Sequence, residues 1–499
     1  MSGPNAGSEV TGPGSGVAAR SVVPALFPTP VSYPAAGSAR LFGPDAHDLD
    51  RHLARFGPRP TAVGPAGDQL LEVLDAIALS GRGGGHFPAA TKWRTVRAAG
   101  GGGLVVANGA EGEPASAKDA ALLQHRPHLV LDGLVCAAEA VAADRCVVWL
   151  HAAADATRHA VLRALAERRA AGLREPAIDV VTGPDGYLSG ESSAVVRALS
   201  GGPALPAFSR VPAARTGVGG LPTLLHNVET LARVGLAART GDDGYPDTGL
   251  VTVLADGRRT VLEVDPATTT THDALRLARS VREPHLVAAL HGVREPHAVA
   301  ALHGVREPPA VAASRVASGQ APRPAGRRPE RDGHPAQLPQ AVLFGGYGGS
   351  WLPWSTAADV PLQRAALRAL GADLGAGILA VLPAERCPLA EVAALATYLA
   401  ASGAQQCGPC LFGLNDVAWL AGDLARGRLG RRGLARLQRF LGQIQGRGAC
   451  HHPDGVVRMV RSALDAFGTE VQRHLRGRCG HPRSAAAFPL PPPPVGDLR

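Results

Sequence analysis

Three cysteines in the C-terminal part of the chain have the spacing of metal or cluster ligands. Cys407 and Cys410 form a Cys-x-x-Cys pair in the segment QQCGPC, and Cys450 follows about forty residues later. Thiolates at such spacing bind zinc or an iron–sulfur cluster, and a lone Cys-x-x-Cys pair also occurs in redox-active and purely structural sites. Because all three fall at the ends of expected helices, the pattern favours a metal site.

Two further segments combine glycine with charged side chains, GRGGGHFPAATKW at 81–93 and NGAEGEPASAKD at 108–119. They hold the two lysines of the chain, Lys92 and Lys118. Glycine lets backbone N–H groups approach a phosphate, which a lysine can neutralise. The glycine run matches neither the usual dinucleotide fingerprint nor Walker A. Taken alone, a structural glycine loop and a polar surface loop explain these segments equally well.

Two acidic segments later in the chain are less specific. Glu191 lies in YLSGESSAVV, and Asn227 and Glu229 lie in LPTLLHNVETL. The capped start of a helix explains either segment when it is taken alone. Their value lies in their order after the glycine-rich and NGAEGEP segments.

Alternating strands and helices must position the first four motifs. Helical spacing or buried apolar runs predict helices at 68–79, 127–143 and 155–171, and strands at 103–108, 146–151 and 177–182. This order is typical of an α/β domain with a largely parallel sheet. The NGAEGEP segment would then follow a strand, where such sheets bind ligands.

The second half of the chain has a different character. The turn Asp256-Gly257 between two apolar runs predicts a hairpin at 251–264. A twelve-residue repeat, VREPHLVAALHG and its copies from Val281, is predicted to be an expanded loop, because each unit carries a helix-breaking proline. From Pro361 onward the chain is predicted to be helical, with helices at 362–370, 389–401, 414–426, 432–445 and 456–467.

Composition excludes several classes of protein. A length of 499 residues suggests about three domains at roughly 150 residues each. No apolar run reaches a membrane span and the N-terminus lacks the order of a signal peptide, so we expect a cytoplasmic protein. The net charge of +9 comes almost wholly from arginine, as in proteins of GC-rich genomes. The sequence has no basic motif interleaved with aromatic residues, so it gives no indication of nucleic-acid binding.

Taken together and in this order, the motifs resemble the NADH-binding flavoprotein of respiratory complex I, the family of NADH-quinone oxidoreductase F subunits. The resemblance covers about residues 46–470. It implies an α/β FMN-binding domain, a small ubiquitin-like β-grasp domain of the SLBB type, and a C-terminal helical bundle with a 4Fe-4S cluster. In that family NADH reduces FMN and single electrons leave through the cluster. The implied cofactors are therefore FMN, a 4Fe-4S cluster and NAD(H).

The resemblance also divides the chain. It implies a disordered tail at 1–45, an FMN/NAD-binding domain at 46–240, a ubiquitin-like domain at 241–355 with the repeat inserted at 281–339, an iron–sulfur domain at 356–485 and a proline-rich tail at 486–499. The implied partners are NADH and another electron-transfer protein of the same complex, such as a 2Fe-2S protein or a ferredoxin. The protein would be at most peripheral to a membrane complex.

Site residues follow from the resemblance, position by position. The FMN phosphate loop matches at Gly81, Arg82, Gly83, Gly84 and Lys92; an aromatic residue near the dinucleotide at Phe87; the flavin pocket at Asn108 and Glu113; the NADH site at Glu191; the NNVET segment at Asn227; and three cluster ligands at Cys407, Cys410 and Cys450. Glu113 and Glu191 would orient the cofactors, and no residue is assigned as an acid–base catalyst.

Several positions depart from the family pattern. His86 and Ala90 replace glycines, Ala110 an aspartate, Ser192 the second acid of the GEE turn, His226 the first asparagine of NNVET, and Thr95 and Val211 (or Pro212) two aromatic residues that stack on the adenine. The expected NADH site thus departs from the family pattern at more positions than the expected flavin site. An alternative function is an NADH-blind electron-transfer adaptor or scaffold, and a zinc-stabilised binding protein is a third.

The cluster motif departs too, because Ala404 stands where the family has its first cysteine. Cys387, His451 and His452 are the candidates for a fourth ligand, and Cys479 is expected to have no role. The stretch from Arg426 to Arg483 is strongly basic. It is either a solvated face or a docking surface for an acidic carrier such as a ferredoxin.

Overall fold

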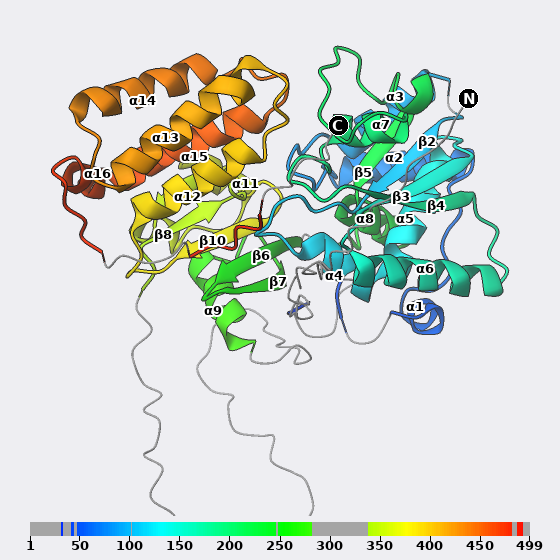
Figure 1. Ribbon diagram of the computed structural model, residues 1–499. Helices are drawn as coiled ribbons and strands as arrows, with labels where there is room; N and C mark the ends of the chain where they lie inside the picture. The colour runs from blue at the N-terminus through cyan, green and yellow to red at the C-terminus, as the bar shows by residue number, and fades with distance from the viewer. Residues whose placement is uncertain are drawn as a thin grey trace, which may run out of the picture.

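The computed structural model describes residues 31–32, 41–43, 47–100, 102–245, 248–281, 338–481 and 487–492. Most of the predicted N-terminal tail, nearly all of the repeat insertion at 281–339 and most of the proline-rich tail lie outside these residues. Figure 1 shows two bodies side by side, an α/β layer structure and a helical bundle, with a second sheet beneath the bundle.

The first sheet is parallel throughout, in the order β4-β3-β2-β5. Its strands are β2 (Leu104–Asn108), β3 (Arg145–His151), β4 (Ala177–Gly183) and β5 (Thr223–Asn227). The first three confirm the predicted strands. β5 was not expected, since its short run TLLHN lies directly before a capped helix and carries no alternation that a sequence pattern can detect.

Helices cover the faces of this sheet (Figure 1). They are α1 (Leu49–Phe56), α2 (Pro65–Ala76), α3 (Ala89–Ala98), α4 (Lys118–His125), α5 (Pro127–Ala140), α6 (Asp155–Ala170), α7 (Ser192–Leu199) and α8 (Val228–Thr240). The nearly all-buried α5 packs directly on α8. A Cβ at Gly133 would lie 1.7 Å from Leu231 O, so only glycine allows this close approach.

The second sheet is mixed and has six strands in the order β1-β7-β6-β10-β8-β9. They are β1 (Val31–Ser32), β6 (Gly249–Ala255), β7 (Arg258–Val264), β8 (Ala341–Phe344), β9 (Ser350–Pro353) and β10 (Ile378–Leu382). The predicted hairpin is β6–β7, and both turn residues, Asp256 and Gly257, have positive φ. The short helices α9 (Thr271–Ser280), α10 (Trp354–Ala357) and α11 (Arg364–Ala369) flank it.

Strand β10 corrects the expectation of a wholly helical chain after Pro361. It lies between β6 and β8, within the region assigned to the helical domain. Its five residues, ILAVL, are all buried. A continuous apolar run of this length does not distinguish a strand from a buried helix, which is why the pattern was missed.

The helical bundle consists of α12 (Pro388–Ala401), α13 (Leu414–Ala425), α14 (Arg431–Ile444), α15 (His452–Ala466) and the short α16 (Gly468–His474). The first four confirm predicted helices to within a few residues. Cys407 and Cys410 lie in the link from α12 to α13, and Cys450 lies directly before α15. Within the described parts of the chain, no helix is long and apolar enough to cross a membrane.

Candidate functional site

The C-terminal ends of β2 and β5 bring Asn108 and Asn227 together. The two residues are register neighbours in the parallel sheet. Asn108 Nδ2 donates to Gly190 O at 2.8 Å, and Asn227 caps α8 by accepting from Glu229 N at 2.9 Å. Both amides are therefore fixed at the edge where parallel sheets bind ligands.

The glycine-rich loop lies over this edge. Arg82 N donates to Thr230 Oγ1 at 2.9 Å, and a Cβ at Gly83 would approach Asn227 Cβ to 3.5 Å. Gly83, Gly84 and Gly85 are exposed, and Gly84 has a φ of +95°. The loop thus presents accessible backbone beside Asn227, an arrangement that suits a phosphate-bearing ligand.

Lys92 and Phe87, two predicted site residues near this loop, differ in their exposure to solvent. Lys92, on α3, donates from Nζ to Leu225 O at 2.9 Å, and burial lowers its pKa. Its ammonium therefore lies against β5. Phe87 keeps 51% of its surface exposed and could stack on a ligand. His86 is held away from solvent, with Nε2 3.0 Å from Gly375 O in the second sheet's domain.

Glu113 is the most deeply buried of the predicted site carboxylates. Its Oε2 accepts from Tyr187 Oη and Tyr347 N, both at 2.9 Å, while Oε1 has no hydrogen-bond partner among the described residues. Burial raises the pKa of Glu113 to about 7, against the opposing effect of these donors. A buried oxygen without a partner is a ready acceptor for a ligand N–H or O–H.

Replacing Glu113 with glutamine should change the pH dependence of stability. A carboxyl whose pKa is about 7 in the native protein rather than 4.5 holds its proton about 3 kcal/mol more tightly there than in the unfolded chain. The native state then binds more protons between these values, so stability falls as pH rises from about 4.5 to about 7.

We therefore compare the free energy of unfolding of Glu113→Gln with that of wild type at two pH values. The variant's advantage should be larger at pH 8 than at pH 5, by about 3 kcal/mol. Urea unfolding at the two pH values measures this. The exposed Glu72→Gln on α2 is the matched control and should show no such change. A Glu113→Gln effect that is equal at both pH values would contradict the raised pKa.

A buried charge network supports Asn227, and sequence reasoning missed it. Lys118 Nζ lies 2.7 Å from Asp119 Oδ1 and 3.1 Å from Glu229 Oε2, and Asn227 Nδ2 donates to Asp119 Oδ2 at 2.6 Å. Arg233 Nε donates to Glu229 Oε1 at 3.0 Å. The one available signal was a lysine in a chain that uses arginine almost everywhere else.

The pKa shifts in this network follow its charges. Burial raises the pKa of Asp119 to about 6 despite the nearby Lys118 ammonium. For Glu229, burial acts in the same upward direction, but the charges of Lys118 and Arg233 prevail and lower its pKa to about 2. The network thus holds one lysine ammonium at the base of the site, below the glycine-rich loop.

The three predicted thiols converge in the helical bundle. Cys410 is buried, and Cys407 and Cys450 are half-buried. Burial, together with the nearby Cys407 and Cys450, raises the pKa of Cys410 to about 12. The fold thus brings Cys410 near Cys450, about forty positions later in sequence, but among the described residues the three sulfur atoms are not all within 4.8 Å of one another.

The carboxylate of Glu191 faces this thiol group from the α/β domain. Glu191 caps α7, accepting from Ser193 N at 2.9 Å and Ala194 N at 3.2 Å. Burial raises the pKa of Cys450, and the Glu191 charge adds to that increase. The predicted NADH-side residue and the predicted cluster ligands are thus neighbours.

Direct contacts join the two bodies beside Glu191. Arg197, on α7, donates from Nη1 to Gln406 Oε1 at 3.2 Å. Gln406 Nε2 in turn donates to Pro206 O at 3.2 Å. Both the oxygen and the nitrogen of the Gln406 side-chain amide therefore bond to the α/β domain, directly before Cys407.

Of the three candidate fourth ligands, two are engaged away from the thiols. Cys387 Sγ lies 3.6 Å from His474 Nε2, in a separate cluster. His452 Nε2 lies 2.8 Å from Leu399 O, and its buried ring packs on Tyr187. His451 is exposed at the N-cap of α15. The structure therefore leaves His451 as the candidate without an observed engagement elsewhere.

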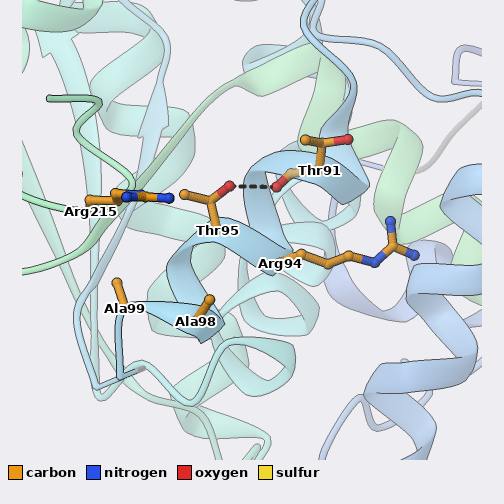
Figure 2. A pocket seen from close by; sticks show the side chains of 6 residues that line it. All are labelled: Thr91, Arg94, Thr95, Ala98, Ala99 and Arg215. Atoms are coloured by element: carbon orange, nitrogen blue, oxygen red, sulfur yellow. Dashed lines mark hydrogen bonds between the residues drawn. The ribbon is translucent and has the colours of Figure 1, made fainter. Parts of the chain in front are cut away.

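A pocket of about 500 Å³ opens beside α3, on the side of Thr95 (Figure 2). It is lined by Thr91, Arg94, Thr95, Ala98, Ala99 and Arg215. Thr95 Oγ1 donates back to Thr91 O at 2.9 Å, and Arg215 reaches toward Thr95 from a separate segment. The pocket has two arginines, Arg94 and Arg215, but no aromatic lining residue. Phe208, seven residues before Arg215 in the sequence, is 70% exposed.

Comparison with known proteins matches two parts of this chain to family models. Residues 74–236 match the Nuo51 FMN-binding domain, and residues 390–474 match the NADH-ubiquinone oxidoreductase-F iron–sulfur binding region. The first span holds the glycine-rich loop, Glu113, Glu191 and Asn227, and the second holds all three converging thiols.

Curated relatives and a solved structure agree with these matches. The F subunit of NADH-quinone oxidoreductase in Streptomyces coelicolor is 26% identical over 86% of this chain and 87% of its own length. The F 2 subunit of the Rhizobium meliloti enzyme is 25% identical over 87% and 96%. The crystal structure of an NAD+-reducing NiFe-hydrogenase in the H2-reduced state has a similar fold, with a TM-score of 0.65, 23% identity, and coverage of 87% of this chain and 68% of that one.

Proposed function

Because the chain is a divergent member of the family of NADH-quinone oxidoreductase F subunits, we propose that it passes electrons from NADH through FMN to a 4Fe-4S cluster. One observation carries the proposal: Cys407 and Cys450 lie near Cys410 in the bundle, and Cys450 is close enough to Glu191 of the FMN-binding domain for that charge to raise its pKa. The proposed donor site and the proposed electron exit are thus near each other within one chain.

The residues present fit FMN. The exposed backbone of Gly83–Gly85 suits the phosphate, and the free Oε1 of Glu113 is an acceptor in the expected flavin pocket. Gly81, Arg82, Asn108 and Asn227 would complete this side. Lys92 contributes positive charge from behind the loop. When bound, FMN supplies hydride acceptance and one-electron release, the chemistry that links NADH to a one-electron carrier.

The donor set at the thiols fits an iron–sulfur cluster. Cysteine thiolate is the usual cluster ligand, and Cys407 and Cys450 are both close enough to Cys410 to raise the pKa of its thiol. Ala404 leaves the fourth position without a thiolate. Hydrogen bonds from Arg197 to Gln406 and from Gln406 to Pro206 O hold the segment before Cys407 against the α/β domain.

The finer assignments of fold and surroundings are also proposals. The second sheet with its β6–β7 hairpin and α9 supports the ubiquitin-like, SLBB-type assignment and the domain order implied by the sequence. Among relatives, the name of the S. coelicolor protein identifies one component of a larger enzyme. We therefore propose that NADH and another electron-transfer protein of such an enzyme are the partners, with the protein peripheral to a membrane complex.

A second candidate function is electron transfer without NADH. The pocket beside Thr95 has no aromatic lining, and the second position where the resemblance implies a ring on the adenine is Val211, an exposed aliphatic residue, or Pro212. Losing both rings would weaken dinucleotide binding by roughly 1–3 kcal/mol. The flavin and cluster sites would then serve an electron-transfer adaptor reduced by another carrier.

Anaerobic titration of the purified protein with NADH, followed by visible absorption, decides between the two functions. Bleaching of flavin and cluster bands at stoichiometric NADH supports NADH oxidation. Bleaching by dithionite alone supports the NADH-blind adaptor. A colourless protein, even after reconstitution with FMN, iron and sulfide, would overturn both.

Restoring one ring should strengthen dinucleotide binding. In Thr95→Phe, a phenyl face in the pocket should lower the apparent Kd for NADH about 2- to 13-fold, from an aromatic pair worth about 0.5–1.5 kcal/mol. Flavin fluorescence quenching under anaerobic conditions measures it. Thr95→Leu adds apolar volume without a π face and is the matched control. Equal gains for both variants would refute a stacking role for this position.

A further inference from the structure

A second cluster of metal-ligating side chains lies at the far end of the helical bundle, apart from the three converging thiols. Ligand atoms of Cys387, His474 and Cys479 all lie within 4.8 Å of one another. Ligand atoms of Glu470 and His481 lie within the same distance of each other and of Cys479. Figure 1 places α16, which carries Glu470 and His474, on the side of the bundle away from the parallel sheet.

Two separations at His474 match those around a tetrahedral zinc ion, while no single oxygen of Glu470 lies within 4.8 Å of all three other ligand atoms, so its carboxylate must turn toward the ion on binding. Zn–S bonds of about 2.3 Å and Zn–N or Zn–O bonds of about 2.0–2.1 Å place tetrahedral ligands about 3.5 Å (S to N) and about 3.3 Å (N to O) apart. Cys387 Sγ lies 3.6 Å from His474 Nε2, and His474 Nε2 lies 3.3 Å from Glu470 Oε1.

Outer contacts orient His474 as in known zinc sites. Its Nδ1 lies 3.1 Å from Leu424 O, a carbonyl that can only accept, so Nδ1 carries the proton. In the neutral ring Nε2 then carries no proton, and it points at Cys387 Sγ and Glu470 Oε1. A backbone carbonyl on the second ring nitrogen is the usual support of a metal-bound histidine.

Backbone N–H groups lie beside the Cys479 sulfur and the Glu470 carboxylate as well. Cys387 is the N-cap of α12, and its sulfur makes no capping hydrogen bond to that helix. His481 N lies 3.5 Å from Cys479 Sγ. Gly480 N donates to Glu470 Oε1 at 2.8 Å, and Arg473 Nη1 lies 3.1 Å from Glu470 Oε2. Such donors stabilise thiolate and carboxylate, the forms that bind metal.

We propose that Cys387, His474 and Cys479 bind a Zn²⁺ ion, with Glu470 as the fourth ligand. Binding releases both thiol protons. The two thiolates balance the charge of the ion, and the remaining negative charge of the Glu470 carboxylate faces Arg473. The site joins the start of α12 to the end of α16 and the chain that follows, segments about ninety residues apart. Because the ligands assemble only in the folded chain, zinc would stabilise the bundle.

The test separates this site from the thiols of the proposed cluster by measuring two metals in three proteins. Full-length wild type, Cys479→Ser and Cys410→Ser are purified without chelators and analysed for zinc and iron per chain by mass spectrometry. Cys479 is exposed and Cys410 is the matched thiol in the other site. Wild type should hold about one zinc ion. Cys479→Ser should lose zinc and keep iron, and Cys410→Ser should lose iron and keep zinc.

X-ray absorption at the zinc edge then identifies the ligands. Wild type should show sulfur at about 2.3 Å and nitrogen or oxygen at about 2.0–2.1 Å, in equal numbers. Three results would overturn the proposal: no zinc in wild type supplied with Zn²⁺ during expression, zinc that is lost in Cys410→Ser rather than Cys479→Ser, or a Cys387–Cys479 disulfide in the isolated protein. Failure of NADH oxidation would leave this outcome unaffected, since metal content is read without turnover.

Discussion

The Cys410→Ser variant should lose its iron while it keeps its flavin. Cys410 is the buried member of the three thiols, and its replacement leaves two cysteines to hold a cluster that normally uses four protein ligands. Iron should fall from about four ions per chain to below about one. FMN should remain at the wild-type ratio, because the glycine-rich loop and Glu113 lie on another domain.

Cys410→Ser should also interrupt electron transfer from the flavin to an acceptor protein. Flavin reduction, by NADH or by dithionite, should persist, while electron delivery to a one-electron acceptor protein should fall to background. Cys146→Ala is the matched control, because Cys146 is a buried thiol on β3, remote from the bundle. Wild-type iron content in Cys410→Ser would show that this thiol is not a cluster ligand.

The Lys118→Met variant should be severely destabilised. The ammonium is 1% exposed and contacts the carboxylates of Asp119 and Glu229 at 2.7 and 3.1 Å. Removing one member of a buried ion pair leaves an uncompensated buried charge, at a loss of about 3–5 kcal/mol in the free energy of unfolding. Asn227, held by Asp119 at 2.6 Å, loses its support, so FMN content should also fall.

A double variant distinguishes charge from packing in this network. Lys118→Met/Asp119→Asn removes both charges of the pair and leaves Glu229 with Arg233 at 3.0 Å. Its loss of stability, measured by denaturant unfolding, should be smaller than that of Lys118→Met. A loss equal to the sum of the two single variants would show that the residues act independently, contrary to the observed network.

The sequence by itself predicted which residues would carry the proposed chemistry. Glycines, amides, carboxylates and thiols in their family order predicted the site residues from Gly81 to Cys450. Strong helical periodicity predicted the four long helices of the bundle, and the Asp256-Gly257 turn predicted the β6–β7 hairpin. These features depend on local residue type and spacing, which a sequence displays directly.

Only the tertiary structure decided how distant residues meet. Short buried strands such as β5 and β10 owe their form to neighbours across the sheet rather than to their own pattern. The pairing of Lys118 with Glu229, of Glu191 with Cys450, and of Cys387 with His474 joins segments whose separation in sequence carries no sign of contact. Packing of helices and sheets fixes these distances, and with them the pKa values and ligand sets on which the proposed chemistry depends.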